Sequence, residues 1–173
     1  MNTANKLTLL RIGAIPILLV LLYLDRDWSR WTAVGVFIIA CVTDTLDGYV
    51  ARNYNQVTNF GKFMDPLADK MLVISVMCFL VERGRFWAWA LVVVLLREFG
   101  VSGLRLLAVE RGRVIAAAWS GKIKTIVTMV VLGFMIPFDW PWLIVAGQIL
   151  ILVTTVVSGA EYFWKNRDVF RRE

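Results

Sequence analysis

Residues 43–70 read TDTLDGYVARNYNQVTNFGKFMDPLADK and lie between two long apolar segments of the chain. Asp44 and Asp47 are spaced i, i+3, which places them on one face of a helix. Asp65 and Asp69 are spaced i, i+4 and share a face in the same way. Two antiparallel helices joined by the short segment between these pairs could bring four carboxylates to a common point. The stretch therefore predicts a helical fold built around an acidic site.

The composition of the chain favours a membrane protein. Of its 173 residues, 59% are hydrophobic, eight are Trp and ten are Phe, whereas soluble domains are about half apolar. Histidine is absent from the sequence, which excludes imidazole acid–base chemistry and imidazole metal ligation. Cys41 and Cys78 lie in apolar runs and are interpreted as buried hydrophobic residues. The net charge of +6 fits anionic lipid headgroups or phosphorylated substrates, and we expect no nucleic-acid partner.

Six apolar segments are long enough to cross a membrane, which requires about 20 mostly apolar residues. The connections between them are short, and the sequence contains no internal repeat. We therefore expect an all-α membrane protein, a six-transmembrane-helix bundle that forms one integral membrane catalytic domain over residues 1–173. The expected spans are roughly 7–24, 31–51, 62–81, 86–109, 120–137 and 141–164.

The distribution of Lys and Arg predicts how this bundle is oriented. With six spans both termini lie on one side, and 15 of the 19 basic residues fall on that side. The other side carries only Arg26, Arg30, Arg83 and Arg85. Cytoplasmic loops carry the excess of basic residues, so we expect both termini in the cytoplasm. The stretch 43–70 then faces the cytoplasm, where a water-soluble substrate meets the lipid.

Four carboxylates this close to hydrocarbon need partners, because a bare charge there costs on the order of several kcal/mol. Oxygen ligands without His or Cys favour Mg²⁺, Mn²⁺ or Ca²⁺ over zinc, and two such ions could clamp a phosphate or diphosphate. Gly48, Ala51 and Gly61 leave room for a ligand beside the helix backbone, and Arg52 can offer a planar fork to phosphate oxygens. The alternative is a set of loop acids paired with nearby cations. Four acids at helical spacing beside small residues favour the metal site.

The same residues resemble a known family. All eight fixed positions of the CDP-alcohol phosphotransferase signature are matched by Asp44-x2-Asp47-Gly48-x2-Ala51-Arg52-x8-Gly61-x3-Asp65-x3-Asp69. The resemblance implies a six-helix membrane enzyme, usually a homodimer, that binds a CDP-activated donor through two divalent ions, Mg²⁺ or Mn²⁺. It also implies roles for individual residues: metal ligation by Asp44, Asp47, Asp65 and Asp69, general base catalysis by Asp69, and donor binding by Gly48, Ala51, Arg52, Thr58, Gly61, Asn5 and Thr8.

A second set of charges lies further along the chain. Arg97 and Glu98 fall in the middle of an apolar helix, where a charge is costly and usually functional. Arg105 follows about two helical turns later, and Lys122 and Lys124 stand at the start of the fifth expected span. Fixed cations around a cavity suit a phosphorylated acceptor. We therefore expect these four basic residues to bind the acceptor phosphate, with Glu98 neutralising one of them.

Two further stretches narrow the resemblance. Residues 97–125, REFGVSGLRLLAVERGRVIAAAWSGKIKT, and residues 5–22, NKLTLLRIGAIPILLVLL, are similar to the corresponding regions of bacterial phosphatidylglycerophosphate synthases. The similarity implies transfer of the phosphatidyl group from CDP-diacylglycerol to sn-glycerol 3-phosphate, giving phosphatidylglycerol phosphate and CMP, in the cytoplasmic membrane of a bacterium. Two positions depart from the usual pattern of that branch: Ala4 stands where Pro is usual, and Thr128 where Gln is common.

Other functions remain as alternatives. The signature is shared by enzymes with different acceptors, so inositol phosphate, serine or a cardiolipin-type acceptor could take the place of glycerol 3-phosphate. A divalent-cation transporter is a more remote alternative, because the other half of the bundle offers no acidic path and Asp139 stands alone on the outer side. A purely structural membrane subunit would leave the charges inside apolar helices unexplained.

Overall fold

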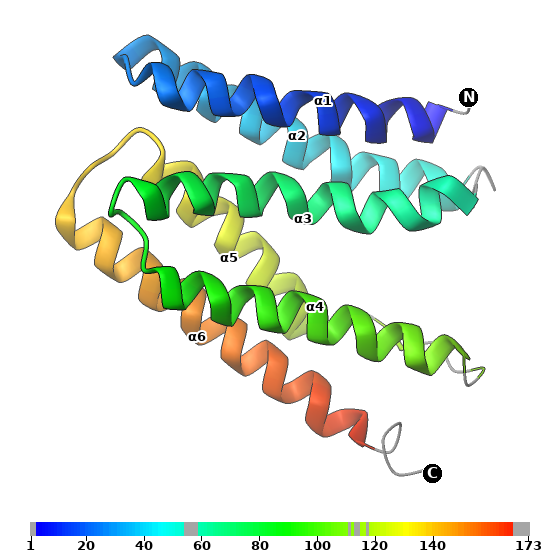
Figure 1. Cartoon of the computed structure of the whole chain (residues 1–173). Helices are drawn as coiled ribbons and strands as arrows, with labels where there is room; N and C mark the ends of the chain where they lie inside the picture. The colour runs from blue at the N-terminus through cyan, green and yellow to red at the C-terminus, as the bar shows by residue number, and fades with distance from the viewer. Residues whose placement is uncertain (1–2, 54–58, 111, 113–114, 117, 168–173) are drawn as a thin grey trace.

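The computed structural model describes residues 3–53, 59–110, 112, 115–116 and 118–167, and gives residues 3–9, 44–53 and 59–69 by their backbone alone. These residues form six α-helices without a strand among them (Figure 1). The helices are α1 (Thr3–Leu24), α2 (Asp27–Asn53), α3 (Asn59–Glu82), α4 (Ala88–Glu110), α5 (Trp119–Met135) and α6 (Pro141–Lys165). The predicted all-α fold is confirmed, and each helix follows one of the six apolar segments with ends that differ by a few residues.

The six helices run back and forth as three hairpins (Figure 1). The turns between α1 and α2, α3 and α4, and α5 and α6 lie at one end of the bundle, and the start of α1 and the end of α6 lie at the other. α1 packs on α2 and α3, and α6 packs on α4 and α5. Contacts of α3 with α4 and of α5 with α2 and α3 join the two groups. The C-terminal part of α2 and the N-terminal part of α3 therefore lie at the end away from the turns, and they carry most of the acidic stretch 43–70.

Local sequence signals explain why the hairpin turns are short. Gly84, in the turn between α3 and α4, adopts a φ of 65°, which glycine reaches without steric cost. Pro141 stands at the start of α6, where its missing N–H removes no helical hydrogen bond. In the turn between α1 and α2, the hydroxyl of Ser29 accepts a hydrogen bond from the Arg26 N–H at 3.0 Å and donates one to the Arg26 carbonyl at 2.9 Å.

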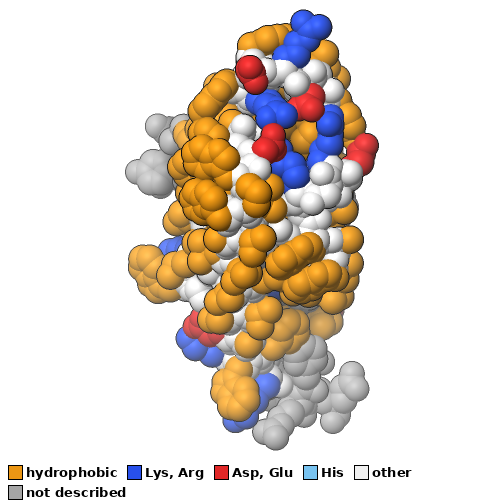
Figure 2. All heavy atoms as spheres, turned by 90° about the vertical axis from the view of Figure 1, so that its left-hand side faces the viewer, with side chains coloured by type: hydrophobic (Ala, Val, Ile, Leu, Met, Phe, Trp, Pro, Cys, Tyr) orange, Lys and Arg blue, Asp and Glu red, His pale blue; other side chains and the backbone are white. Residues whose placement is uncertain are grey.

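The bundle is apolar both inside and outside. Its interior holds fully buried side chains from five helices, namely Leu18, Phe37, Leu72, Leu132 and Ile151. Large apolar side chains also cover the outer faces of the helices, and Figure 2 shows them over much of one end and its flanks. Soluble monomers rarely expose apolar surface of this extent. The surface is therefore the kind that suits contact with lipid.

One helix of the described chain, α6, is long and apolar enough by itself to cross a membrane. The apolar stretch Leu10–Leu24 of α1 is shorter. α4 carries Arg97, Glu98 and Arg105 inside an otherwise apolar sequence, which lowers its mean hydropathy although the helix has the predicted position. Six helices are thus observed where six were expected, and the number that crosses the membrane stays a prediction.

Candidate active site

The four aspartates of the acidic stretch lie on the two helices that the sequence predicted. Asp44 and Asp47 belong to the last turns of α2, and Asp65 and Asp69 belong to the first half of α3. α2 and α3 are in contact with each other, and the helical backbone gives each pair of aspartates a common face. Their side chains lie outside the described part of the structure, so their role as metal ligands stays a prediction.

The expected donor residues fall in the same region. Gly48, Ala51 and Arg52 are in α2 and Gly61 is in α3, whereas Asn5 and Thr8 are in the first turns of α1. Thr58 lies outside the described residues. The structure thus describes the backbone of six of the seven positions, and their contacts with a donor stay predictions.

Arg97 is held by two neighbours inside the bundle. Its side chain is 11% exposed, and its Nη1 lies 3.1 Å from Oε1 of Glu98, the next residue of α4. Its Nη2 donates a hydrogen bond to the hydroxyl of Ser158 on α6 at 2.5 Å. The guanidinium is therefore fixed between α4 and α6.

Glu98 pairs with a second cation as well. Nζ of Lys124, on α5, lies 2.6 Å from the same Oε1 atom, and the two side chains are 5% and 14% exposed. One carboxylate thus bridges α4 and α5 and neutralises part of the charge of Arg97 and Lys124. The expected neutralising role of Glu98 corresponds to these two ion pairs.

Tyr162 of α6 brings Arg105 into the same group. The side chain of Tyr162 is buried, and its hydroxyl accepts hydrogen bonds from Nη2 of Arg105 at 2.7 Å and from the backbone N–H of Ala118 at 2.8 Å. The guanidinium carbon atoms of Arg97 and Arg105 lie 5.5 and 5.3 Å from the centroid of its ring, within the range of a cation–π interaction. We call Arg97, Glu98, Arg105, Lys124, Ser158 and Tyr162 the basic cluster.

Lys70 links the basic cluster to the acidic helix α3. Its ammonium donates a hydrogen bond to the hydroxyl of Ser102, and that hydroxyl donates to the Glu98 carbonyl at 2.8 Å. Lys70, Glu98 and Lys124 also line a small cavity of about 30 Å³, which is enough for about one water molecule. Asp69, the predicted base, directly precedes Lys70 in α3, so its backbone adjoins this link.

The basic cluster has unused capacity to bind an anion. Its three cations face one carboxylate, which leaves a net charge of +2 at neutral pH. The Nε atoms of Arg97 and Arg105 are buried, and neither has a hydrogen-bond partner among the described residues. Buried N–H donors are rarely left unsatisfied in proteins, because each costs about 1–3 kcal/mol. The cluster can therefore gain two charge-assisted hydrogen bonds from a ligand with acceptor oxygens.

The structure brings together three of the four expected acceptor-binding residues, namely Arg97, Arg105 and Lys124. Lys122 is exposed, and its ammonium lies 4.8 Å from the centroid of the Trp119 ring. Sequence reasoning missed Tyr162 and Ser158. A signal for both was present, because they are polar residues four apart in the apolar helix α6.

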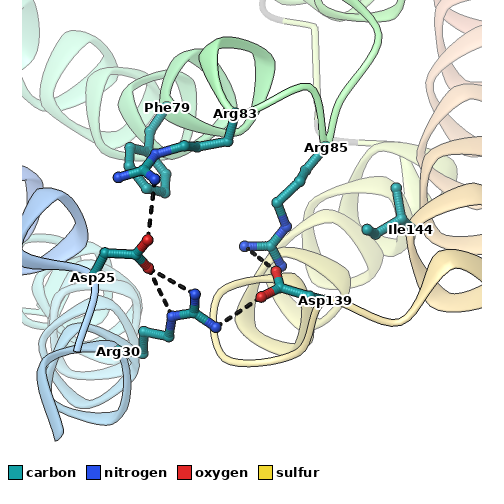
Figure 3. A pocket seen from close by; sticks show the side chains of 7 residues that line it. All are labelled: Asp25, Arg30, Phe79, Arg83, Arg85, Asp139 and Ile144. Atoms are coloured by element: carbon teal, nitrogen blue, oxygen red, sulfur yellow. Dashed lines mark hydrogen bonds and ion pairs between the residues drawn. The ribbon is translucent and has the colours of Figure 1, made fainter. Parts of the chain in front are cut away.

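A larger cavity lies at the opposite end of the bundle, among the hairpin turns. It has a volume of about 300 Å³ and is lined by Phe79, Ile144 and the five charged residues Asp25, Arg30, Arg83, Arg85 and Asp139 (Figure 3). We call these five the turn cluster; Figure 2, which faces the turn end, shows Lys, Arg, Asp and Glu side chains gathered together there, with apolar side chains over much of the rest of that face.

Every charged side chain of the turn cluster has an ion-pair partner within it, and its three arginines and two aspartates leave a net charge of +1. Arg30 lies 2.7 Å from Asp25 and 2.8 Å from Asp139, Arg83 lies 3.0 Å from Asp25, and Arg85 lies 2.8 Å from Asp139. The hydrogen bond from Arg30 is the main reason that the pKa of Asp25 is lowered below its usual value. Because the turn cluster lies at the end away from the acidic stretch and has the smaller excess of positive charge, we take the basic cluster as the candidate site.

Comparisons with known proteins identify the family of the chain. The model of the CDP-alcohol phosphatidyltransferase family matches residues 1–159. A CDP-diacylglycerol–glycerol-3-phosphate 3-phosphatidyltransferase of Bacillus subtilis strain 168 is 41% identical over 98% of this chain and 97% of its own length. The protein of the same name from Escherichia coli strain K12 is 37% identical over 91% of this chain and 88% of its own length. A probable phosphatidylglycerophosphate synthase of Mycobacterium tuberculosis strain H37Rv is 41% identical over 93% of this chain and 79% of its own length. The resemblance seen in the sequence is confirmed: the chain belongs to the CDP-alcohol phosphatidyltransferase family.

Proposed function

We propose that this chain transfers the phosphatidyl group of CDP-diacylglycerol to sn-glycerol 3-phosphate, with phosphatidylglycerol phosphate and CMP as products. Two relatives that match at least 91% of the chain carry the name of this activity. The observation that carries the choice of acceptor is the basic cluster. Its net charge of +2 and its two unsatisfied buried Nε–H groups suit a phosphate dianion better than uncharged or zwitterionic acceptors such as serine.

The acidic helices fit a pair of divalent ions, Mg²⁺ or Mn²⁺. Four carboxylates on two helices in contact supply an oxygen-only donor set, which these hard cations prefer. Asp44, Asp47, Asp65 and Asp69 would hold them. When bound, such ions offset the negative charge of the donor diphosphate. Donor contacts come from Asn5, Thr8, Gly48, Ala51, Arg52, Thr58 and Gly61.

The acceptor is oriented by its phosphate and activated by Asp69. Arg97, Arg105 and Lys124 bind the phosphate of glycerol 3-phosphate, and Lys122 attracts it from the exposed face of α5. Asp69 takes the proton of the 1-hydroxyl group. The resulting oxygen forms a bond to the phosphorus atom that carries the diacylglycerol, the bond from that phosphorus to the CMP oxygen breaks, and CMP leaves with the electron pair.

The enzyme works as one integral membrane domain of the bacterial cytoplasmic membrane. Six helices span the bilayer, both termini are cytoplasmic, and two copies form a homodimer. The apolar outer faces of the helices support the membrane location, and the excess of Lys and Arg at the end that holds the termini supports the orientation. The homodimer is what the family resemblance implies. The membrane lipids are then both the surroundings of the enzyme and the source of its donor.

The test is an acceptor competition with the full chain purified into lipid nanodiscs. CMP release is measured with CDP-diacylglycerol, Mg²⁺ and one acceptor at a time: glycerol 3-phosphate, inositol phosphate, serine or phosphatidylglycerol. Of the four acceptors, we expect only glycerol 3-phosphate to give CMP release above background. Faster release with any other acceptor would overturn the proposed substrate. Arg97→Gln should lose activity, and the matched control Arg26→Gln, which changes an exposed arginine at the turn end, should keep it.

A further inference from the structure

Two arginines from different turns of one helix meet at a single ring. Arg97 and Arg105 are eight residues apart on α4, which separates their Cα atoms by about 12 Å along the helix axis. Both guanidinium groups nevertheless lie within 5.5 Å of the centroid of the Tyr162 ring on α6. The ring therefore holds together two charges that would otherwise repel each other.

The two arginines depend on Tyr162 to different degrees. Arg97 has two further anchors, Glu98 at 3.1 Å and Ser158 at 2.5 Å. For Arg105, the described residues provide one hydrogen bond, to the Tyr162 hydroxyl at 2.7 Å, and one cation–π contact, with the same ring. Loss of the hydroxyl should therefore release Arg105 and leave Arg97 in place.

The surroundings of Tyr162 keep the ring in one position. Its hydroxyl also accepts the backbone N–H of Ala118, the residue that caps α5. At Gly121 of α5, an added Cβ would lie 3.2 Å from the ring and 3.3 Å from Nη2 of Arg97. The glycine thus lets α5 pack directly against the ring and the arginine, so that three helices enclose this contact.

We infer that Tyr162 is the positioning residue of the acceptor site, which holds Arg105 beside Arg97 so that both guanidinium groups can bind one phosphate. An arginine side chain loses rotamer entropy when it is ordered, and this loss occurs during folding when the ring already holds the group. The ligand then meets an ordered site. This inference rests on the proposed function, because it takes the acceptor phosphate to be the ligand.

The experiment measures KM for glycerol 3-phosphate, KM for CDP-diacylglycerol and kcat for variants of the full chain in nanodiscs. Tyr162→Phe keeps the ring and removes the hydroxyl. We expect it to raise KM for glycerol 3-phosphate about tenfold, the usual effect of one hydrogen bond to a charged group. KM for CDP-diacylglycerol should stay within about twofold. Tyr162→Leu also removes the ring and should raise KM for glycerol 3-phosphate further.

The two arginines supply the second part of the test. In an Arg105→Ala background, Tyr162→Phe should have no further effect on KM for glycerol 3-phosphate, whereas in an Arg97→Ala background its full effect should remain. The matched control is Tyr23→Phe, which removes a tyrosine hydroxyl bonded to Glu82 at the turn end of the bundle. It should leave both KM values unchanged.

The possible failures are distinguishable. If Arg97→Ala and Arg105→Ala both leave KM for glycerol 3-phosphate unchanged, the proposed acceptor site is wrong, and this inference fails with it. If those variants raise KM but both Tyr162 variants do not, the acceptor site stands and the positioning role is wrong. The positioning role would also be overturned if Tyr162→Phe lowers the stability of the protein and changes both KM values, or kcat alone. A general loosening of the fold would act in this way, whereas loss of the positioning role should change KM for glycerol 3-phosphate only.

Discussion

The carboxylate of Glu98 offers the sharpest test of the basic cluster. It pairs with Nζ of Lys124 at 2.6 Å and with Nη1 of Arg97 at 3.1 Å, and all three side chains are at most 14% exposed. Glu98→Gln keeps the shape of the side chain but removes its charge. The variant leaves two buried cations without their carboxylate, and breaking a buried ion pair in this way costs about 3–5 kcal/mol. For a chain of this size that loss should lower Tm by roughly 6–20 °C.

The assay is thermal unfolding of the purified protein in a fixed detergent, read by intrinsic Trp fluorescence. Glu161→Gln is the matched control, because the Glu161–Lys165 pair is an exposed pair on one helix face. Such a pair contributes about 0.3–0.5 kcal/mol, so the control should lower Tm by no more than about 2 °C.

A double variant separates the charge from the contact. Glu98→Gln with Lys124→Met removes one charge of each sign and keeps the volume of both side chains similar. Because the penalty of the single variant comes mainly from an uncompensated cation, the double variant should regain much of the lost stability. If Glu98→Gln and Glu161→Gln have the same Tm, the description of the Glu98 contacts as buried ion pairs is refuted. A double variant no more stable than Glu98→Gln would refute the charge argument.

Three further outcomes are expected. Asp69→Asn should abolish CMP release while the folded protein remains, and substantial residual turnover would reject Asp69 as the base. Arg30 lowers the pKa of Asp25 in the folded protein. The Asp25 carboxylate therefore stabilises the fold at pH values above its pKa in the unfolded chain, and this stabilisation is lost as the pH falls through its pKa in the folded protein. Asp25→Asn should accordingly make Tm fall less steeply below about pH 4. Gly147→Ala should lower the free energy of unfolding by about 1–3 kcal/mol, because the new Cβ would lie 2.7 Å from Cγ1 of Val131. Adding Val131→Ala should restore Tm. A Gly147→Ala protein with unchanged Tm would contradict the tight packing of α5 on α6.

The helices were predictable because their signals are local. Each apolar run is long enough to specify a helix, and α6 begins at Pro141, the first residue of the expected sixth span. The two pairs of aspartates could be assigned to α2 and α3 from spacing alone, since the i, i+3 and i, i+4 periods describe a helix wherever it packs. The number of membrane spans could not be obtained as directly. Charged residues inside a helix such as α4 lower its mean hydropathy, the quantity by which a membrane span is recognised, although the segment still forms a helix.

The basic cluster was predictable only in part. Arg97 was expected because a charge inside an apolar helix is costly, and Lys124 because it adds a cation at the start of the fifth expected span. The structure places both against Glu98. Lys122 and Lys124 look alike in the sequence, yet only Lys124 is buried, because residues two apart point to different sides of α5. Tyr162 was missed because its partners are 57 and 44 residues away in the chain. Contacts over such distances are decided by how α4, α5 and α6 pack, which no local pattern encodes.

The turn cluster determines where the helices can move apart. Arg30 joins the first hairpin turn to the third through Asp139, and Arg83 and Arg85 join the second turn to both (Figure 3). These ion pairs join all three hairpins at the turn end, and the basic cluster also joins the second hairpin to the third in the other half of the bundle. A small rotation of the first hairpin against the other two would therefore displace its atoms least at the turn end and most at the far end, where α2 carries Asp44 and Asp47. A lipid that enters sideways between helices would therefore find the widest opening beside the acidic stretch.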